Sequence, residues 1–362
     1  MKNVIVYREA DRYSGWPANY GIWGWGDEIV LGFVSGHPDS SGGFHARDRT
    51  RPFTTMQARS LDGGEHWQVG AIPARTPGGR ALSADEHVVD ELRAEHALDG
   101  PDGPKPCDRA FDFTHPDFAL MCARTNLHAG TRTWFYASED RCRSWQGPYS
   151  LPMFGQPGVA GRTDYVVLVS QRCLLFLTAT QETEEGSHVF CAETTDGGRS
   201  FEFVSWVSPQ PETGHSIMPA SALTADGRLL VATRERRGTG REARNWIDLF
   251  ASDDEGRSWK PAGRPVPDTG GGGNPPTLTR LADGRLCLTY GCRKPPFGMR
   301  ARVSDDGGST WGDEIVLRDD AGSHDIGYPR SIQRADGSMV TAYYYTDDAG
   351  GACYIAATIW SP

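Results

Sequence analysis

Short runs of alternating apolar and polar residues recur along most of the chain, and tight-turn signals separate them. An Asp-Gly dipeptide between two apolar runs is typical of a β-hairpin. Such turns occur within residues 225–229, 282–286 and 335–339, and residues 26–29 and 170–173 occupy the same place in other units. The pattern therefore predicts antiparallel strands throughout the chain.

A second repeat interleaves with these hairpins. It reads Ser or Thr, Asp two residues later, Gly after two more and an aromatic residue after a further three. The copies begin at Ser60, Ser138, Thr194, Ser252 and Ser304. In the second copy, Cys142 replaces the glycine. The carboxylate can accept backbone N–H groups across a tight turn, the glycine supplies a positive φ, and the aromatic ring packs the hairpin against its neighbour. Copies that recur roughly every 50 to 80 residues indicate a repeat architecture.

Each repeat unit consists of strand A, a tight turn, strand B, a longer loop, strand C, the repeat turn and strand D. Six units fit the chain, with strand A beginning near Ala18, Ala110, Thr163, Pro219, Pro275 and Tyr328. The sixth unit lacks a strand D, so we expect residues 3–7 to supply it and close the ring, which removes exposed strand edges. The predicted fold class is all-β: a six-bladed β-propeller of four-stranded antiparallel blades, with residues 1–362 as one domain.

The longest interval between repeat turns holds an insertion at residues 70–108. Residues 83–86 read as a helix capping box before the apolar Val88, Val89 and Leu92. We therefore predict a short helical insertion near residues 83–98, lying over one face of the ring.

The same topology sorts the loops onto two faces. The A–B turns and the repeat turns lie on one face, and the D–A and B–C loops surround the central funnel on the other. Since function usually resides on loops carried by a rigid scaffold, we look for it around the funnel.

Arginines are prominent among the funnel residues. Converging guanidinium groups suit a carboxylate or a sulfate, although any one of them could simply pair with an acidic residue at the rim. The predicted substrate-binding residues are Arg234, Arg244, Arg293, Arg300, Arg330 and Asn274, the last presented by the glycine-rich segment 270–273.

Three further residues are candidates for catalysis. The B–C loop of the first unit, residues 37–48, contains two histidines and two aspartates, and His45 or Asp48 could act as an acid or base. A lone aspartate in such a loop could equally cap a turn. Tyr328 enters the innermost strand of the last unit beside arginines, so it is a candidate nucleophile, the alternative being a packed tyrosine that donates one hydrogen bond.

Along its whole length the chain resembles the sialidase superfamily, in which the repeat turn is called an Asp box. That resemblance implies three arginines that hold a sugar carboxylate, a tyrosine nucleophile paired with a glutamate, and an aspartate as acid/base. Tyr328 matches the tyrosine position. Arg244 and Arg300 suit the second and third arginines, with Arg234 and Arg293 as competitors, and Asp48 or Asp39 suits the acid/base.

Two positions depart from the sialidase pattern. Residues 15–19 read Gly-Trp-Pro-Ala-Asn in place of an Arg-Ile-Pro-like motif, with Arg8 and Arg12 nearby as substitutes. Residues 218–221 read Met-Pro-Ala-Ser where a glutamate is expected, and Glu235 and Glu182 are the possible replacements.

The resemblance implies a carbohydrate-active enzyme of sialidase type. We expect an exo-glycosidase that cleaves a glycosidic bond next to an acidic, carboxylate-bearing sugar. Two alternatives stay open: a rhamnose–glucuronate-type glycosidase or lyase that uses His45, and a non-catalytic glycan-binding propeller.

Composition narrows the range of partners. A net charge of −10 argues against a nucleic-acid or anionic-membrane surface. The eight cysteines show no metal-binding spacing, and we expect no metal or cofactor. The first residues lack the apolar run of a signal peptide, so we expect a cytoplasmic protein whose partner is an acidic oligosaccharide.

Overall fold

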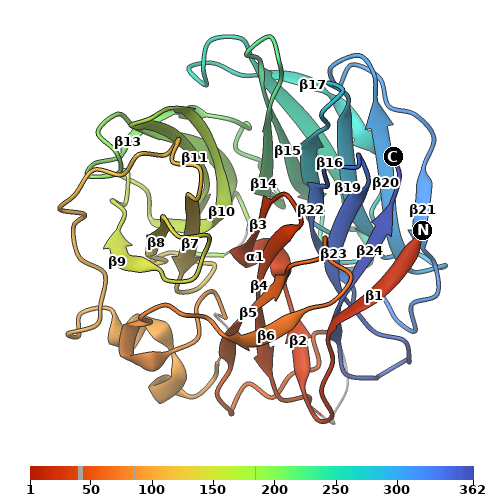
Figure 1. The fold of residues 1–362 in the computed structure, drawn as a ribbon, viewed down its shortest axis with the longest axis horizontal. Coiled ribbons are helices and arrows are strands. Elements are labelled where there is room, and N and C mark those ends of the chain that lie inside the picture. Colours follow the sequence, from red (N-terminus) through yellow and green to blue (C-terminus); the bar gives the residue numbers. More distant parts are fainter. Residues whose placement is uncertain (40–43, 85–86, 184) are drawn as a thin grey trace.

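The computed structural model describes residues 1–39, 44–84, 87–183 and 185–362, and their strands form six antiparallel sheets arranged as blades around a centre (Figure 1). The predicted six-bladed β-propeller is confirmed. Blades 1 to 6 follow one another along the chain, so the first and the last are neighbours in the ring.

The elements of the first three blades are as follows. Blade 1 contains β2 (Tyr13–Gly15), β3 (Gly21–Trp25), β4 (Glu28–Gly36), β5 (Thr54–Ser60) and β6 (Gln68–Ala71). Blade 2 contains β7 (Ala119–Arg124), β8 (Thr133–Ser138) and β9 (Gln146–Ser150). Blade 3 contains β10 (Gly158–Val169), β11 (Arg172–Thr180), β12 (His188–Thr194) and β13 (Glu202–Trp206).

The remaining blades each have four strands. Blade 4 contains β14 (His215–Leu223), β15 (Leu229–Arg237), β16 (Arg244–Ser252) and β17 (Lys260–Val266). Blade 5 contains β18 (Thr277–Arg280), β19 (Leu286–Cys292), β20 (Gly298–Ser304) and β21 (Ile315–Arg318). Blade 6 contains β22 (Gly327–Gln333), β23 (Met339–Tyr345), β24 (Tyr354–Trp360) and β1 (Lys2–Tyr7).

The N-terminal strand closes the ring, as the sequence predicts. β1 pairs antiparallel with β24, with Lys2 opposite Ile359, so the two ends of the chain share blade 6. This pairing satisfies the backbone groups of β24 that would otherwise form an exposed edge.

Blade 2 differs from the prediction, because its three strands include no inner strand near Ala110. The backbone there bonds to the next blade instead: Phe111 N–H donates to the carbonyl of Gly197, and Phe113 N–H to that of Ser170. Strand A of the first unit was expected near Ala18, but that segment forms the short helix α1 (Pro17–Tyr20), and the strand begins at Gly21. α1 packs against β4 and β22 and also contacts β7 and β10.

The core consists of apolar layers between neighbouring blades. Leu175 and Leu177 of β11 belong to the cluster shared with blade 2, whereas Leu174 and Phe176 belong to the cluster shared with blade 4. Successive side chains of a strand point to opposite faces, so an apolar run buries both faces of its sheet. Each blade therefore depends on two neighbours.

The five repeat turns share one set of hydrogen bonds. In the first, Ser60 Oγ accepts the N–H of Gly64 at 2.8 Å, and Asp62 Oδ1 accepts the N–H of His66 at 2.9 Å. The second turn keeps these bonds although Cys142 stands in place of glycine at φ 60°. The other three turns repeat the pattern.

Among its described residues, the insertion is helical only in short 3-10 turns. Three short 3-10 helices, η1 (Pro77–Gly79), η2 (Asp90–Leu92) and η3 (Ala94–Ala97), replace the one predicted helix. The capping-box residues 85 and 86 lie outside the described residues. Another 3-10 turn, η4 (Gly240–Glu242), precedes β16. Every helix in the described ranges is too short to cross a bilayer.

We predict that Gly308→Ala destabilises the propeller by about 1–3 kcal/mol. Gly308 has a φ of 90°, and a Cβ there would lie 2.9 Å from Leu249 Cδ2 in the core. Gly70→Ala is the matched control, since Gly70 has room for a Cβ and needs no positive φ. Urea unfolding measures both free energies, and equal values for the two variants would contradict the prediction.

Candidate functional site

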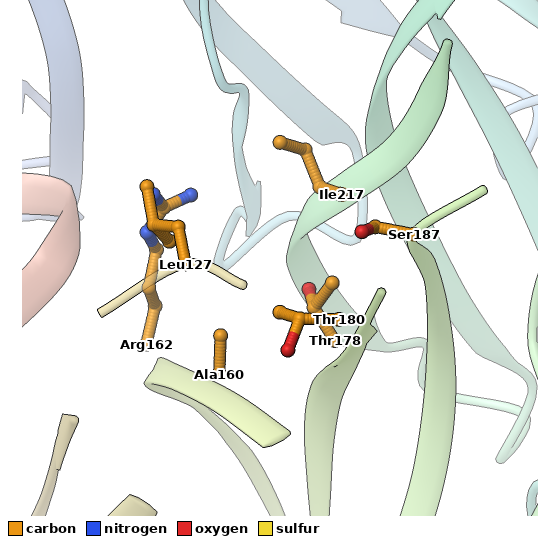
Figure 2. Close-up of a pocket in the computed structure, with 7 residues that line it drawn as sticks. All are labelled: Leu127, Ala160, Arg162, Thr178, Thr180, Ser187 and Ile217. Carbon is orange, nitrogen blue, oxygen red and sulfur yellow. The ribbon is translucent and has the colours of Figure 1, made fainter. Parts of the chain in front are cut away.

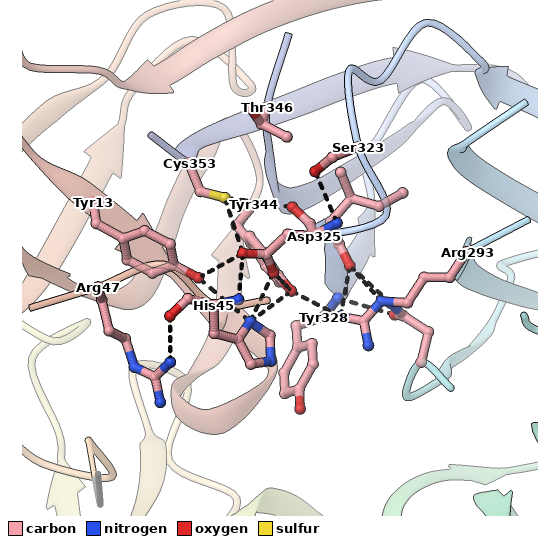
Figure 3. A network of polar contacts seen from close by, with 12 residues as sticks. Tyr13, His45, Arg47, Arg293, Ser323, Asp325, Tyr328, Tyr344, Thr346 and Cys353 are labelled. Atoms are coloured by element: carbon pink, nitrogen blue, oxygen red, sulfur yellow. Dashed lines mark hydrogen bonds and ion pairs between the residues drawn. The ribbon is translucent and has the colours of Figure 1, made fainter. Parts of the chain in front are cut away.

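His45 and Asp325 form a buried pair where the loops of blades 1 and 6 meet on the funnel face (Figure 3). His45 Nδ1 lies 2.7 Å from Asp325 Oδ1, and the backbone N–H of His45 donates to Asp325 Oδ2 at 2.9 Å. The positive φ of 55° at His45 accompanies this double contact. One carboxylate therefore fixes both the backbone and the ring of the histidine.

This arrangement determines which ring nitrogen of His45 is basic. A proton on Nδ1 is donated to Asp325, which leaves the lone pair on Nε2. Burial lowers the pKa of His45 to about 4, although the carboxylate opposes the shift. The pKa of Asp325 is lowered to about 2 because hydrogen bonding and charge attraction from His45 outweigh its burial. At neutral pH the pair is a neutral imidazole beside a carboxylate.

Three other side chains hold Asp325 in place. Tyr344 donates its hydroxyl to Asp325 Oδ1 at 2.9 Å, and Tyr13 donates to Oδ2 at 3.4 Å. Cys353 Sγ contacts Oδ2 at 3.6 Å. Only 5% of Asp325 is exposed, so it orients His45 and is not itself accessible to a substrate.

Arg293 extends this network toward blade 5. Its Nη2 donates to the Tyr344 hydroxyl at 2.8 Å and to the carbonyl of Ile326 at 3.0 Å. Its Nη1 donates to the carbonyl of Gly273 at 2.5 Å. A continuous chain of contacts thus runs from Arg293 through Tyr344 and Asp325 to His45.

Tyr328 stands beside His45, with their ring centroids 6.3 Å apart. Its φ is 50°, and its backbone N–H donates to Asn274 Oδ1 at 3.0 Å. Asn274 is fully buried and also bonds the backbone of Gly291 and Ile326, so its amide holds Tyr328 in position instead of facing the funnel. Arg234 Nη1 lies 3.4 Å from the Tyr328 hydroxyl.

Arg162 lines a small pocket (Figure 2) and also lies near Tyr328. The Arg162 guanidinium lies 5.8 Å from the Tyr328 ring centroid. The pocket is lined by Leu127, Ala160, Arg162, Thr178, Thr180, Ser187 and Ile217. Its volume of about 20 Å³ admits one water-sized group.

The second acid/base candidate, Asp48, lies in a turn. Its Oδ1 accepts the N–H of Thr50 at 2.9 Å and the Thr50 hydroxyl at 2.6 Å. These bonds lower the pKa of Asp48, and a turn cap is the alternative that the sequence left open. The network of contacts that runs from Arg293 through Tyr344 and Asp325 therefore includes His45 and not Asp48.

Three of the predicted arginines lie apart from that network. Arg300 is 3% exposed and donates to Glu314 at 3.2 Å and to the carbonyl of Pro296 at 2.9 Å. Arg244 is exposed at the start of β16. Arg330 donates to the carbonyls of Ala18, at 2.7 Å, and Thr163, so it fastens α1 to blade 3.

Arg330 also lines a cavity of about 320 Å³ among the inner strands. Burial raises the pKa of Asp164 in this cavity to about 6, and the charge of Arg330 opposes that shift. Asp164 accepts the backbone N–H and the hydroxyl of Ser221. These contacts join blades 3, 4 and 6 beneath the funnel.

The possible replacements for missing sialidase residues are otherwise engaged. Glu235 is buried and accepts hydrogen bonds from Ser216 and Thr233 and an ion pair from Arg237. Glu182 is exposed. The two N-terminal arginines bind Asp347 and His37, respectively: Arg8 Nη1 lies 2.8 Å from Asp347, and Arg12 Nη1 lies 3.0 Å from His37 Nε2.

Sequence reasoning assigned no role to Asp325, Tyr344, Tyr13 or Arg162. Asp325 stands three residues before Tyr328, and an acidic residue so close to the start of the last inner strand was a usable signal. Tyr344 is the middle residue of a Tyr-Tyr-Tyr run, and nothing in the sequence distinguishes it from its two neighbours. In the structure all three are buried.

In the described part of the chain, no three His, Cys, Asp or Glu side chains gather in a way that could hold a metal ion. All eight cysteines are among the described residues, and they are buried and form no disulfide.

Solved structures share the fold over nearly the whole chain. An unknown-function protein from Dyadobacter fermentans is 20% identical, with a TM-score of 0.71 over 99% of this chain and 97% of its own. The α-L-arabinanase of Penicillium chrysogenum, solved with arabinobiose, is 12% identical, with a TM-score of 0.62 over 100% and 98%. The NanB sialidase of Streptococcus pneumoniae, as a mutant, is 11% identical, with a TM-score of 0.60 over 99% and 70%.

No curated protein matches the chain in sequence. The model of the BNR repeat-like domain family does match, over residues 118–341. Together with the sialidase fold, this match confirms the resemblance to the sialidase superfamily that the repeat turns indicate. Since the matched segment is more than half of the chain, the protein belongs to the BNR repeat-like domain family.

Proposed function

We propose that this protein is a carbohydrate-active enzyme that binds an acidic sugar in its funnel and cleaves the adjacent glycosidic bond, with His45 as the general base. The observation that carries the proposal is the 2.7 Å contact between His45 Nδ1 and Asp325 Oδ1. It leaves Nε2 unprotonated, which is the state that a base requires. Similar propellers that bind arabinobiose or belong to sialidases support a carbohydrate as the substrate.

The acidic sugar is inferred from the arginines around Tyr328. The Arg162 guanidinium lies 5.8 Å from its ring centroid, and Arg234 Nη1 lies 3.4 Å from its hydroxyl. The buried Arg293, 5.9 Å from the same ring, adds positive charge. Guanidinium groups bind carboxylates through paired, charge-assisted hydrogen bonds. A protein of net charge −10 that gathers cations at one site favours an anionic ligand there.

Elimination is the reaction that these groups support best. With the carboxylate of a uronate neutralised by arginine, His45 Nε2 would remove the proton from C5. The electron pair forms the C4–C5 double bond, the C4–O bond breaks, and the leaving oxygen takes a proton from the Tyr328 hydroxyl or from water. The products are an unsaturated uronate and a free hydroxyl, so no co-reactant is needed.

Hydrolysis through Tyr328 is the second candidate, and the contact between Arg234 and the Tyr328 hydroxyl favours it. A guanidinium there stabilises a phenolate, which could attack the anomeric carbon as the glycosidic C–O bond breaks. This route needs a separate acid for the leaving oxygen. Asp48, a candidate for that acid, is held in a turn by Thr50. Glu235, a possible replacement for the glutamate that pairs with the nucleophile, is already engaged by two hydroxyls and Arg237, and we therefore place elimination first.

The test is a screen of uronate-containing oligosaccharides and sialosides with two readouts. We expect absorbance near ~235 nm, the signature of an unsaturated uronate, to rise with uronate substrates. New reducing ends without that absorbance would indicate hydrolysis. Binding of these glycans without either signal would overturn the enzyme proposal and favour a glycan-binding propeller.

We predict that His45→Ala lowers kcat by about 10²–10⁴-fold, because a positioned base contributes that much. Asp325→Asn should also lower kcat, since an amide no longer fixes the Nδ1–H tautomer. The matched control is His66→Ala, which removes an exposed histidine on a repeat turn. Steady-state kinetics on the best substrate from the screen measures these values of kcat. If the kcat of His45→Ala lies within about twofold of wild type, His45 is not the base.

The pH profile gives an independent prediction. His45 must be neutral to accept a proton, and its pKa is lowered to about 4. Activity should therefore be constant above this value and fall about tenfold per pH unit below it. We expect kcat/KM to show an acid limb near pH 4, whereas a limb near the ordinary histidine value of about 6.5 would contradict the buried, neutral state of His45.

A further inference from the structure

Phe44 is an aromatic residue on the funnel face that takes no part in the proposed elimination or hydrolysis. Phe44 is 42% exposed, yet its ring contacts groups from three blades. The His45 ring lies 3.8 Å from it, the Arg293 guanidinium 4.7 Å, and the His324 ring 5.1 Å, stacked within 6° of parallel. Phe44 thus bridges the loops of blades 1, 5 and 6.

The two groups that Phe44 covers are themselves largely shielded from water. Arg293 is 3% exposed, and 14% of the His45 side chain is exposed. Phe44 packs directly against both. Removal of its ring would leave a gap on the solvent side of His45 that water could fill.

We propose that Phe44 is a positioning residue that seals His45 and Arg293 from bulk water. This role rests on the proposed function of His45, but its physical effect can be measured without any substrate. Both neighbours contact its ring, and His324 stacks against it, so the phenyl group is held by its surroundings.

The environment of His45 shows why the seal matters. The titratable and charged groups around it are Asp325, Arg293, Arg47, Tyr13, Tyr328, Tyr344 and, through Asp325, Cys353. Asp325 favours the protonated imidazole, whereas Arg293 and Arg47 oppose it. Burial is the largest influence, and it keeps the ring neutral. Water admitted by loss of Phe44 would weaken that influence and screen Arg293 at the same time.

The experiment is an NMR titration of His45 in the full chain, followed through labelled imidazole carbons without substrate. We expect Phe44→Ala to raise the pKa of His45 by about one unit or more toward the ordinary histidine value. Phe44→Tyr keeps a ring in place and should restore the wild-type titration. An unchanged His45 titration in Phe44→Ala would overturn the proposal.

Trp206→Ala is the matched control. Trp206 is also a partly exposed aromatic residue, at 39%, and its ring stacks on His188 at 4.1 Å, far along the chain on β13. This variant should leave the His45 titration unchanged. Since Phe44 is partly exposed, Phe44→Ala should shift Tm by less than about 3 °C. A much larger decrease in Tm would show that Phe44 mainly stabilises the fold, and would contradict the sealing role.

The NMR titration and the glycan screen distinguish failure of the sealing role of Phe44 from failure of the proposed enzymatic function. If Phe44→Ala raises the pKa of His45 but no glycan in the screen is cleaved, the seal stands and the enzyme proposal fails. If cleavage occurs and its acid limb moves upward in Phe44→Ala together with the NMR titration, both stand. If cleavage occurs while both the limb and the titration stay in place, Phe44 has no sealing role.

Discussion

The structure depends on one constraint: every blade buries both faces, so the ring has to close. An apolar layer lies between each pair of neighbouring blades, and blade 6 obtains its outer strand from residues 2–7 at the other end of the chain. Closure makes the first and last blades neighbours. The loops that follow β4 and precede β22 are consequently held against each other on the funnel face.

That neighbourhood creates the candidate site. His45 and Asp325 are 280 residues apart in sequence, and they meet because the ring closes between blades 6 and 1. The pair is supported by groups from both sides of the junction, with Tyr13 on β2 and Tyr344 on β23. Arg293 adds a cation from blade 5. The chemistry thus depends on the same closure that stabilises the fold.

The sequence predicts the fold well because its signals are local. Each repeat turn is closed by bonds within a few residues, such as Ser60 to Gly64, so the motif can be recognised from spacing alone. The missing inner strand of blade 2 has a different origin. Phe111 and Phe113 bond to the turns of blade 3, and α1 packs beside β7. Neither contact has a local signal in the sequence.

The site was only partly predictable, because many of its contacts join residues that are far apart in the sequence. His45, Tyr328, Arg234 and Arg293 could be found, because the register places their loops on the funnel face. Whether an arginine in such a loop faces the funnel or the backbone depends on long-range partners. Arg300 binds Glu314 and nearby carbonyls, and Arg330 binds the carbonyl of Ala18, more than 300 residues away. Asp325 was overlooked because its partner lies at the far end of the chain.

The central claim is that His45 and Asp325 act as one unit in catalysis, and a double-mutant cycle tests it most directly. It compares kcat/KM for wild type, His45→Ala, Asp325→Asn and the double variant on one acidic glycan. If the carboxylate acts only by orienting the histidine, the double variant loses no more activity than His45→Ala alone. Losses that simply add would mean that the two residues act independently, and would contradict this account.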